Sequence, residues 1–418
     1  MSSAVESSVS PRAAFGHRDF RIYQASAFLK NVATQMQAVA VALHVYALWP
    51  SAEALGYVGL AQFLPVVGLS LITGQVADRF DRRSVLLLCY GGLTLCSLGF
   101  YLMAERSTGV APLYFLLFLT GLARAFGGPA GQSLVPHLVP PHHFSNAVTW
   151  GSTLFQAANI VGPAIGGTVY RMVQRPAPVY LLCTVLSALS FSLVVALRVR
   201  TGRMDKAAVS IEQLLAGLRY VWNQKIILGA ISLDLFAVLL GGAVALMPIF
   251  AQKILFVGPS GMGILRSAPA AGAAVVAVGI AYLPLRRNIG RWMFGAVAIF
   301  GTATIVFGLS KSFLLSVAAL VIIGASDMVS VVIRSNLVQM STPPHMRGRV
   351  SAVNLIFIGA SNELGEFESG LTAKWFGTVP SVVLGGIGTC VVVWLGARLF
   401  PQLKNVDRMP SKAAENVL

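Results

Sequence analysis

The chain alternates long apolar stretches with short polar or charged breaks from one end to the other. A stretch of about 20 apolar residues is long enough for a helix to cross the hydrocarbon core of a membrane. Stretches such as Leu181 to Leu197 do not alternate between apolar and polar residues, which argues against the strands of a barrel. We therefore predict an all-α polytopic membrane protein with twelve transmembrane helices, near residues 20–48, 54–77, 84–104, 111–131, 145–170, 177–197, 226–251, 260–283, 292–309, 313–336, 348–373 and 378–399.

The longest polar connection follows the sixth predicted span and divides the chain nearly in half. Within it Ile211, Leu214, Leu215 and Leu218 recur at helical spacing, which predicts an amphipathic helix lying on the inner membrane surface. The resulting organisation is a cytoplasmic tail (1–19), a six-helix bundle (20–197), a cytoplasmic linker (198–225), a second six-helix bundle (226–400) and a cytoplasmic tail (401–418).

The two halves resemble each other when one is shifted by 203 positions, which lays residues 138–167 over residues 341–370. Asn159, Gly162 and Gly167 then meet Asn362, Gly365 and Gly370. Two six-helix halves related by an axis along the membrane normal are the architecture of one class of secondary transporters.

Composition and charge support the membrane assignment and give an orientation. Hydrophobic residues make up 56% of the 418 positions and charged residues only 11%, where a soluble domain has about a quarter. The net charge of +16 could suggest a nucleic-acid partner, but most Lys and Arg residues outside the spans fall on alternate loops. This positive-inside pattern places both termini in the cytoplasm, and no nucleic-acid partner is expected.

The loop between the second and third predicted spans reads GQVADRFDRRS and contains Gly74, Asp78, Arg79, Arg82 and Arg83. A glycine permits close helix approach, and an aspartate can face the positive N-terminus of a neighbouring helix. We expect Asp78 to form a conformational latch with the cytoplasmic start of the eleventh span, near His345 to Arg349. The segment resembles the loop motif of the major facilitator superfamily.

The resemblance covers essentially the whole chain and is strongest to the branch of enterobactin exporters and macrolide efflux proteins. Its segments are GLARAFGGPAGQSLVPHLVP (residues 121–140) and NELGEFESG (residues 362–370). The fifth span ends in GPAIGG, similar to part of the family's antiporter signature, although Ala158 stands where a glycine is usual. The resemblance implies the superfamily fold, export across a bacterial-type inner membrane, and a helix-packing motif formed by Gly162, Pro163, Gly166 and Gly167.

Ionisable side chains inside predicted spans are candidates for substrate binding or ion coupling, because burying them in a membrane is costly. Equally, each can cap a helix, snorkel or brace a kink. Arg124 and Asp327 occupy equivalent positions of the two halves and could pair in one conformation, or each could have a local partner. The substrate and coupling candidates are Lys30, Asn31, Gln35, Arg124, Asp234, Asp327, Asn362, Glu363, Glu366 and Glu368.

Two of the predicted helices carry polar faces. In the eleventh span Ser361, Asn362, Gly365, Ser369 and Thr372 gather on one arc, with the three glutamates at or beyond its edges. Crowded carboxylates in a low dielectric suit a proton carrier near neutral pH. In the first span Lys30, Asn31, Thr34 and Gln37 share one face, which we expect to line water.

These patterns predict a secondary active transporter that works by alternating access and exchanges protons for an amphipathic siderophore-like or drug-like molecule, moved outward. A lysophospholipid flippase of the same superfamily is the main alternative. An intramembrane enzyme built on His137, His142 and His143 is disfavoured, because no acid lies nearby in the sequence to complete a site. We expect no metal, no cofactor apart from the proton, contacts with membrane lipids, and a monomer.

Overall fold

The computed structural model describes residues 12–106, 109–200, 211–283, 285, 287–343 and 346–407. Within them, the side chains of 70–72, 74, 75, 77–79, 211–214, 348, 352, 355, 356 and 360 are not described. The described residues are almost entirely helical. The N-terminal half consists of η1 (Ala13–Gly16), α1 (Arg18–Leu48), α2 (Ala52–Arg79), α3 (Arg82–Glu105), α4 (Val110–Leu134), η2 (Val135–His137), η3 (Pro141–His143), α5 (Phe144–Val173) and α6 (Ala177–Val195).

The C-terminal half repeats this arrangement after the linker. It consists of α7 (Ile211–Asn223), α8 (Lys225–Leu240), η4 (Ala243–Leu246), α9 (Met247–Ile249), η5 (Phe250–Ile254), α10 (Gly258–Tyr282), α11 (Ile289–Leu309), α12 (Phe313–Met340), α13 (Arg347–Phe376), α14 (Thr378–Leu399) and α15 (Pro401–Lys404). The seventh predicted span is broken after Leu240, at the adjacent glycines Gly241 and Gly242, and Gly242 lies so close to the backbone of Gly365 that no side chain would fit there. The other predicted spans each match one long helix.

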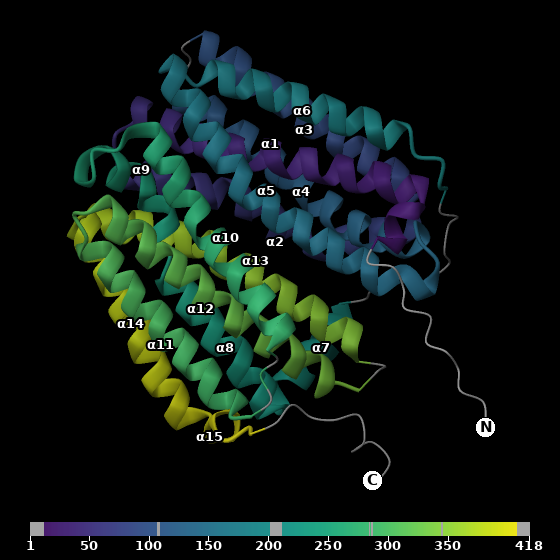
Figure 1. Cartoon of the computed structure of the whole chain (residues 1–418), viewed down its shortest axis with the longest axis vertical. Coiled ribbons are helices and arrows are strands. Elements are labelled where there is room, and N and C mark those ends of the chain that lie inside the picture. The colour runs from purple at the N-terminus through teal and green to yellow at the C-terminus, as the bar shows by residue number, and fades with distance from the viewer. Residues whose placement is uncertain are drawn as a thin grey trace.

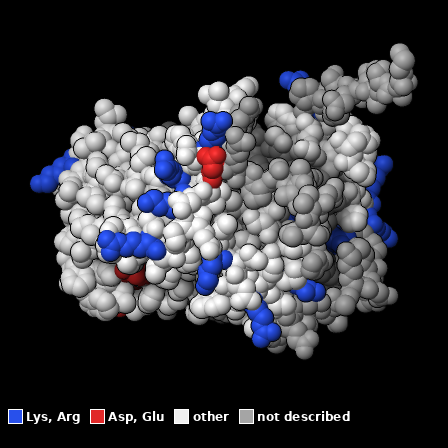
Figure 2. Space-filling view, turned by 90° about the horizontal axis from the view of Figure 1, so that it is seen from below, with Lys and Arg blue, Asp and Glu red and all other residues white. Residues whose placement is uncertain are grey.

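The long helices form two bundles that lie side by side, one from each half of the chain (Figure 1). Among the described residues, eight helical segments are long and apolar enough to cross a membrane. Neither α1 nor α5 is among them, although each is as long. These two helices pack along each other, so part of each is shielded from lipid. Figure 2 shows a surface that is mostly uncharged and whose charged side chains are mainly Lys and Arg.

Successive helices run in opposite directions, so the start of α1 and the end of α14 lie on one face of the molecule, here called the terminal face. The connections after α1, α3 and α5 lie on the opposite face. The amphipathic helix α7 lies at the terminal face, where Gly217 contacts the backbone of Arg349 and the Tyr220 hydroxyl donates to the Ser341 carbonyl. Its Trp222 is exposed, as an interfacial helix requires.

The apolar core joins the two bundles in only one half of the molecule. One cluster contains residues of both bundles near the opposite face, such as Leu43, Phe100, Phe250 and Phe307. Towards the terminal face the described core residues separate into three clusters, each within a single bundle. The described apolar core is therefore continuous between the bundles near the opposite face and divided between them towards the terminal face.

Two helix pairs make most of the contact between the bundles: α2 packs along α13 and α5 along α10. The shift that relates the halves exchanges these two pairs, so both obey the internal repeat. A Cβ on Gly370 would lie 2.6 Å from the Cα of Gly56 and 2.8 Å from the Ala52 carbonyl oxygen. A Cβ on Gly167 would lie 2.9 Å from the Cα of Gly263. Closure at the opposite face thus depends on glycines that let backbones touch.

The predicted packing motif of α5 serves two helices. A Cβ on Gly162 would lie 2.6 Å from the Cβ of Gln35, and one on Gly166 would lie 3.0 Å from the Cα of Met36, both in α1. Gly167 and the Pro163 carbonyl instead face Gly263 of α10. The motif therefore packs α5 within its own bundle and across to the other.

An ion pair closes the same contact at its outer edge. The Lys374 ammonium of α13 lies 2.7 Å from a carboxylate oxygen of Glu53 in α2. The Tyr57 hydroxyl donates to the other Glu53 oxygen at 2.7 Å, and the Tyr57 ring lies 6.0 Å from that of Phe367. These side chains connect the bundles beside the Gly56–Gly370 contact.

We expect Glu53→Gln or Lys374→Gln to favour opening at the opposite face, because either change removes the pair. The Lys374 side chain is 51% exposed, so the opened population should rise only about two- to fivefold. Spin labels at Glu105 and Lys311 would report it as a longer distance. The charge-swapped variant Glu53→Lys/Lys374→Glu should restore the closed distance, and unchanged distances in both single variants would contradict the gate.

Gly370→Ala should also open this face, since the new methyl group meets backbone that cannot rotate away. Gly279→Ala is the matched control: Gly279 is likewise helical, and a Cβ there has no neighbour within 4 Å. The same labels should move apart in Gly370→Ala and stay in place in Gly279→Ala. If the distance between the labels is the same in both variants, close approach of the helices is not required for closure at the opposite face.

Candidate functional site

An ion pair connects the two bundles deeper in the molecule. Nη2 of Arg124, in α4, lies 3.4 Å from Oε1 of Glu363, in α13. Nη1 of Arg124 donates to the Gln62 side-chain oxygen of α2 at 2.8 Å. The Arg124 side chain is 41% exposed and that of Glu363 only 16%. The pair lies about 10 Å along α13 from the Gly370 contact, since helical residues rise 1.5 Å each.

Further charges gather around this pair. Glu366 lies about one turn further along α13 and faces α2. A Cβ added to Gly59 of α2 would lie 2.9 Å from the Cβ of Glu366. Arg266 of α10 is close enough to interact electrostatically with Glu366, Arg124 and Glu363. Lys30 of α1 interacts with Arg124 and has its ammonium 6.0 Å from the centre of the Tyr90 ring. We call Lys30, Arg124, Arg266, Glu363 and Glu366 the interface cluster.

Amide side chains extend the polar surface of the N-terminal bundle. The Gln35 amide donates to the Asn159 side-chain oxygen at 2.6 Å, and the Asn159 amide donates to Gln156 at 3.2 Å. The expectation that the first span has a single water-lined face is wrong for Gln37. Gln37 is buried and accepts from the Ser97 hydroxyl of α3 at 2.7 Å.

The faces of α13 separate the three glutamates. Glu363 and Glu366 face the N-terminal bundle together with Phe367 and Gly370. Part of the predicted polar stripe faces its own bundle instead: Gly365 contacts α8, and the Ser381 hydroxyl of α14 donates to the Ser369 carbonyl. Glu368 lies beside the hydroxyls of Ser369 and Thr372, and the exposed Asn362 bonds to the Ile358 carbonyl of its own helix. Only two of the glutamates therefore join the interface cluster.

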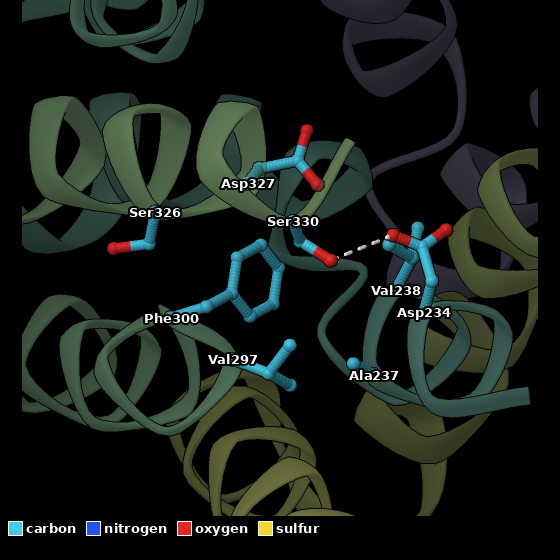
Figure 3. Close-up of a pocket in the computed structure, with 8 residues that line it drawn as sticks. All are labelled: Asp234, Ala237, Val238, Val297, Phe300, Ser326, Asp327 and Ser330. Carbon is cyan, nitrogen blue, oxygen red and sulfur yellow. Dashed lines mark hydrogen bonds between the residues drawn. The ribbon is translucent and has the colours of Figure 1, made fainter. Parts of the chain in front are cut away.

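Asp234 and Asp327 belong to a second charged group inside the C-terminal bundle. Asp234 lies 3.2 Å from Nη1 of Arg334, with both side chains less than 10% exposed, and Arg334 also donates to Asn354. The Ser330 hydroxyl turns toward Asp234 at 3.4 Å (Figure 3). Asp327 lies near Asp234 and Arg334. Asp234, Ser330 and Asp327 line a small cavity of about 10 Å³, which has room for about one water molecule.

Arg124 and Asp327 do not pair with each other in this conformation, and pairing in another conformation stays a prediction. Arg124 pairs with Glu363, whereas Asp327 interacts with the Asp234–Arg334 pair. The Arg334 side chain is only 3% exposed, so this charge is buried within the C-terminal bundle.

The loop motif is only partly described. The side chains of Gly74, Asp78 and Arg79 and residue His345 lie outside the described residues, and so does the predicted latch. Nη1 of Arg82 donates to Nε2 of His137 at 3.0 Å. Arg83 donates to the carbonyl oxygens of Val194 and Val195 at the end of α6. These two arginines fix the start of α3 to neighbouring helices of the N-terminal bundle.

The histidines of the α4–α5 connection also have structural partners. Nε2 of His17 lies 3.1 Å from Nδ1 of His143, which joins the start of α1 to this connection. Desolvation and the neighbouring His142 and His17 lower the pKa of His143, so it is largely neutral at pH 7. No group of three potential metal ligands occurs among the described residues. The geometry therefore offers no positive support for acid–base or metal chemistry at this connection.

Sequence reasoning missed several residues of the contact between the bundles. Glu53 and Lys374 fall at span ends, where charges are ordinary, and Gln62 and Gly59 sit within an otherwise apolar run. Arg266 lies near the start of a predicted span, where snorkelling is ordinary, yet it joins the interface cluster. The spacing of Glu363, Glu366 and Gly370 along one helical face was the one available signal.

Comparison with known proteins agrees with this architecture. The family model described as transmembrane secretion effector, of the major facilitator superfamily, matches residues 9–418. The enterobactin exporter EntS of Citrobacter koseri is 24% identical over 402 residues, which cover 94% of each chain. The multidrug efflux pump Tap of Mycobacterium tuberculosis is 27% identical over 375 residues, 86% of this chain and 88% of that one.

Among solved structures, the nucleoside transporter NupG superimposes with a TM-score of 0.71 at 14% identity, covering 92% of this chain and 99% of that one. At that identity the likeness concerns the fold alone. The family of the chain follows from three findings: two six-helix bundles, a repeat that relates their contacts, and a family match along nearly the whole length. The chain is a multi-pass membrane transporter of the transmembrane secretion effector family of the major facilitator superfamily.

Proposed function

We propose that the protein exports an amphipathic small molecule in exchange for protons. The observation that carries this proposal is the Arg124–Glu363 pair, which joins the two bundles at a contact that alternating access must open. A carboxylate whose counter-ion sits on the other bundle changes its electrostatic environment whenever the bundles move apart. That change is what a coupled proton site requires.

The proposed exchange has two steps, which the position of the Arg124–Glu363 pair supports. With the opposite face closed, Arg124 stabilises the ionised form of Glu363, and a proton there is released. When α2 and α4 move away from α13, Glu363 loses its counter-ion and takes up a proton. Glu366 faces α2 at the same contact and interacts with Arg124 of the other bundle as well as with Arg266 of its own, so it would share part of this role.

The direction and substrate class draw on the relatives. One of these relatives is named as an exporter of enterobactin and another as a multidrug efflux pump. Amide side chains such as Gln35, Asn159 and Gln62 beside apolar helix faces suit a substrate with both polar and apolar parts. The proton would be the coupling ion, with no metal or organic cofactor and a monomer as the working unit.

A lipid flippase is the second candidate because of one observation. A largely apolar groove of about 430 Å³ runs between α10, α11 and α12, with Arg291 and Trp292 at one end and Ile299 along it. A basic and an aromatic residue beside apolar surface suit a lipid headgroup and its chain. None of the residues lining this groove belongs to the interface cluster, so we favour export through the site between the bundles.

The terminal face is proposed to be cytoplasmic, in a bacterial-type inner membrane. In a chain carrying Cys390→Ser, a cysteine at Lys311 should react with a membrane-impermeant maleimide in intact bacterial cells. A cysteine at Lys404 should react only after permeabilisation, because α15 lies on the terminal face. The reverse pattern would overturn the proposed orientation.

Glu363→Gln should reduce export driven by a pH gradient by about tenfold or more, because the amide keeps a hydrogen-bonding group but cannot carry the proton. Substrate exchange without a gradient should continue in the same proteoliposomes. Glu366→Gln should show a partial loss.

The matched control is Glu368→Gln, which changes an acid of the same helix that does not face the other bundle. It should retain most of the gradient-driven export. If the Glu363→Gln and Glu366→Gln variants both export as well as the unchanged protein, the two glutamates have a structural role only, and the proposed role in proton coupling is wrong.

A further inference from the structure

The interface cluster is unbalanced in charge. Lys30, Arg124 and Arg266 supply three positive charges, and Glu363 and Glu366 supply two negative ones. Arg124 is paired with Glu363, and Arg266 interacts most strongly with Glu366. One positive charge, that of Lys30, is left over.

Lys30 has no acidic partner of its own in the part of the chain that the structure describes. The four ion pairs there involve Arg18, Arg124, Arg334 and Lys374. The Lys30 ammonium lies 6.0 Å from the centre of the Tyr90 ring, the outer limit of a cation–π interaction. The charged group with which it interacts is Arg124, which repels it.

The other buried acids do not supply the missing charge. Asp327 interacts with Asp234 and Arg334 inside the C-terminal bundle, and Glu368 lies beside Ser369 and Thr372. An ammonium held within the membrane without a counter-ion is costly unless a ligand neutralises it.

The position of Lys30 makes such a ligand reachable. Tyr90 belongs to the core cluster of the N-terminal bundle near the terminal face, where the described core residues of the two bundles are separate. Arg124, beside Lys30, is 41% exposed although it already pairs with Glu363. Both cations therefore border the half of the molecule in which the bundles do not share a core.

We propose that Lys30 and the exposed edge of Arg124 form a subsite for an anionic group of the transported molecule, so that the substrates are organic anions with an apolar part. This inference rests on the proposed transport function and names its substrate class. Lys30 supplies a charge that no described side chain neutralises, and Arg124 adds hydrogen-bond donors in a fixed plane. Arg124 keeps its pair with Glu363, so anion binding and the proton site use different edges of one guanidinium.

Three ligands with one aromatic group and different charge test the subsite: dansylglycine (anionic), dansylamide (neutral) and dansylcadaverine (cationic). Their affinities are measured by calorimetry on the full-length protein in nanodiscs, with empty nanodiscs subtracted. Dansylglycine should bind at least about tenfold more tightly than dansylamide, as expected for one charge-assisted contact, and dansylcadaverine should bind most weakly.

Lys30→Gln should lower the affinity for dansylglycine about tenfold and leave that for dansylamide unchanged, whereas Lys30→Arg should retain the preference. Lys253→Gln is the matched control, because Lys253 also lies over a tyrosine ring, Tyr46 at 5.5 Å, yet belongs to η5 near the opposite face. It should change neither affinity. The thermal unfolding midpoint of each variant shows that the fold is kept.

The proposal is overturned if dansylglycine binds no more tightly than dansylamide, or if dansylglycine does not bind at all. An equal loss of both ligands in Lys30→Gln overturns it as well. Transport of the same compounds in proteoliposomes separates the two hypotheses. Anion preference without pH-gradient dependence would refute proton coupling alone, and gradient-driven export without anion preference would refute the anion subsite alone.

Discussion

Charged side chains inside a membrane need a partner of opposite charge, and this protein supplies some of those partners from the other bundle. Arg124 and Lys374 each pair with an acid across the contact between the halves. Breaking such a pair leaves a charge with reduced solvation, so the partner must then be replaced by a proton, a substrate or water. The positions of the charges thus connect the chemistry of the site to the relative position of the bundles.

The helix α13 carries most of these connections on a single face. Glu363, Glu366, Gly370 and Lys374 follow one another at helical spacing and all face α2 or α4. The glycine permits backbone contact, while the charged residues on either side make that contact dependent on their ionisation. Movement of this one helix away from α2 would open the contact at the opposite face and separate Glu363 from Arg124.

The Asp234–Arg334 pair illustrates the contrasting case. Both of its charges come from the C-terminal bundle, and both side chains are almost fully buried. A rigid rotation of one bundle against the other leaves this pair intact, so its natural role is to fix α8 against α12. The same residue types therefore serve structure or switching according to whether their partner lies on the same bundle or on the other.

Sequence by itself determined the number, order and approximate limits of the long helices, because the width of a bilayer sets the length of each apolar run. It also determined the repeat and identified α13 as the helix with unusual acids. Tertiary structure decided the partners. The periodicity of one helix cannot show which other helix covers a face, so the separation of Glu363 and Glu366 from Glu368 appeared only with α2 and α14 in place. Glu53 and Lys374 lie at span ends, where charges are ordinary, so the sequence gives no sign of their pairing. Their role is evident only from the structure, in which two helices distant in sequence bring the charges to 2.7 Å from each other.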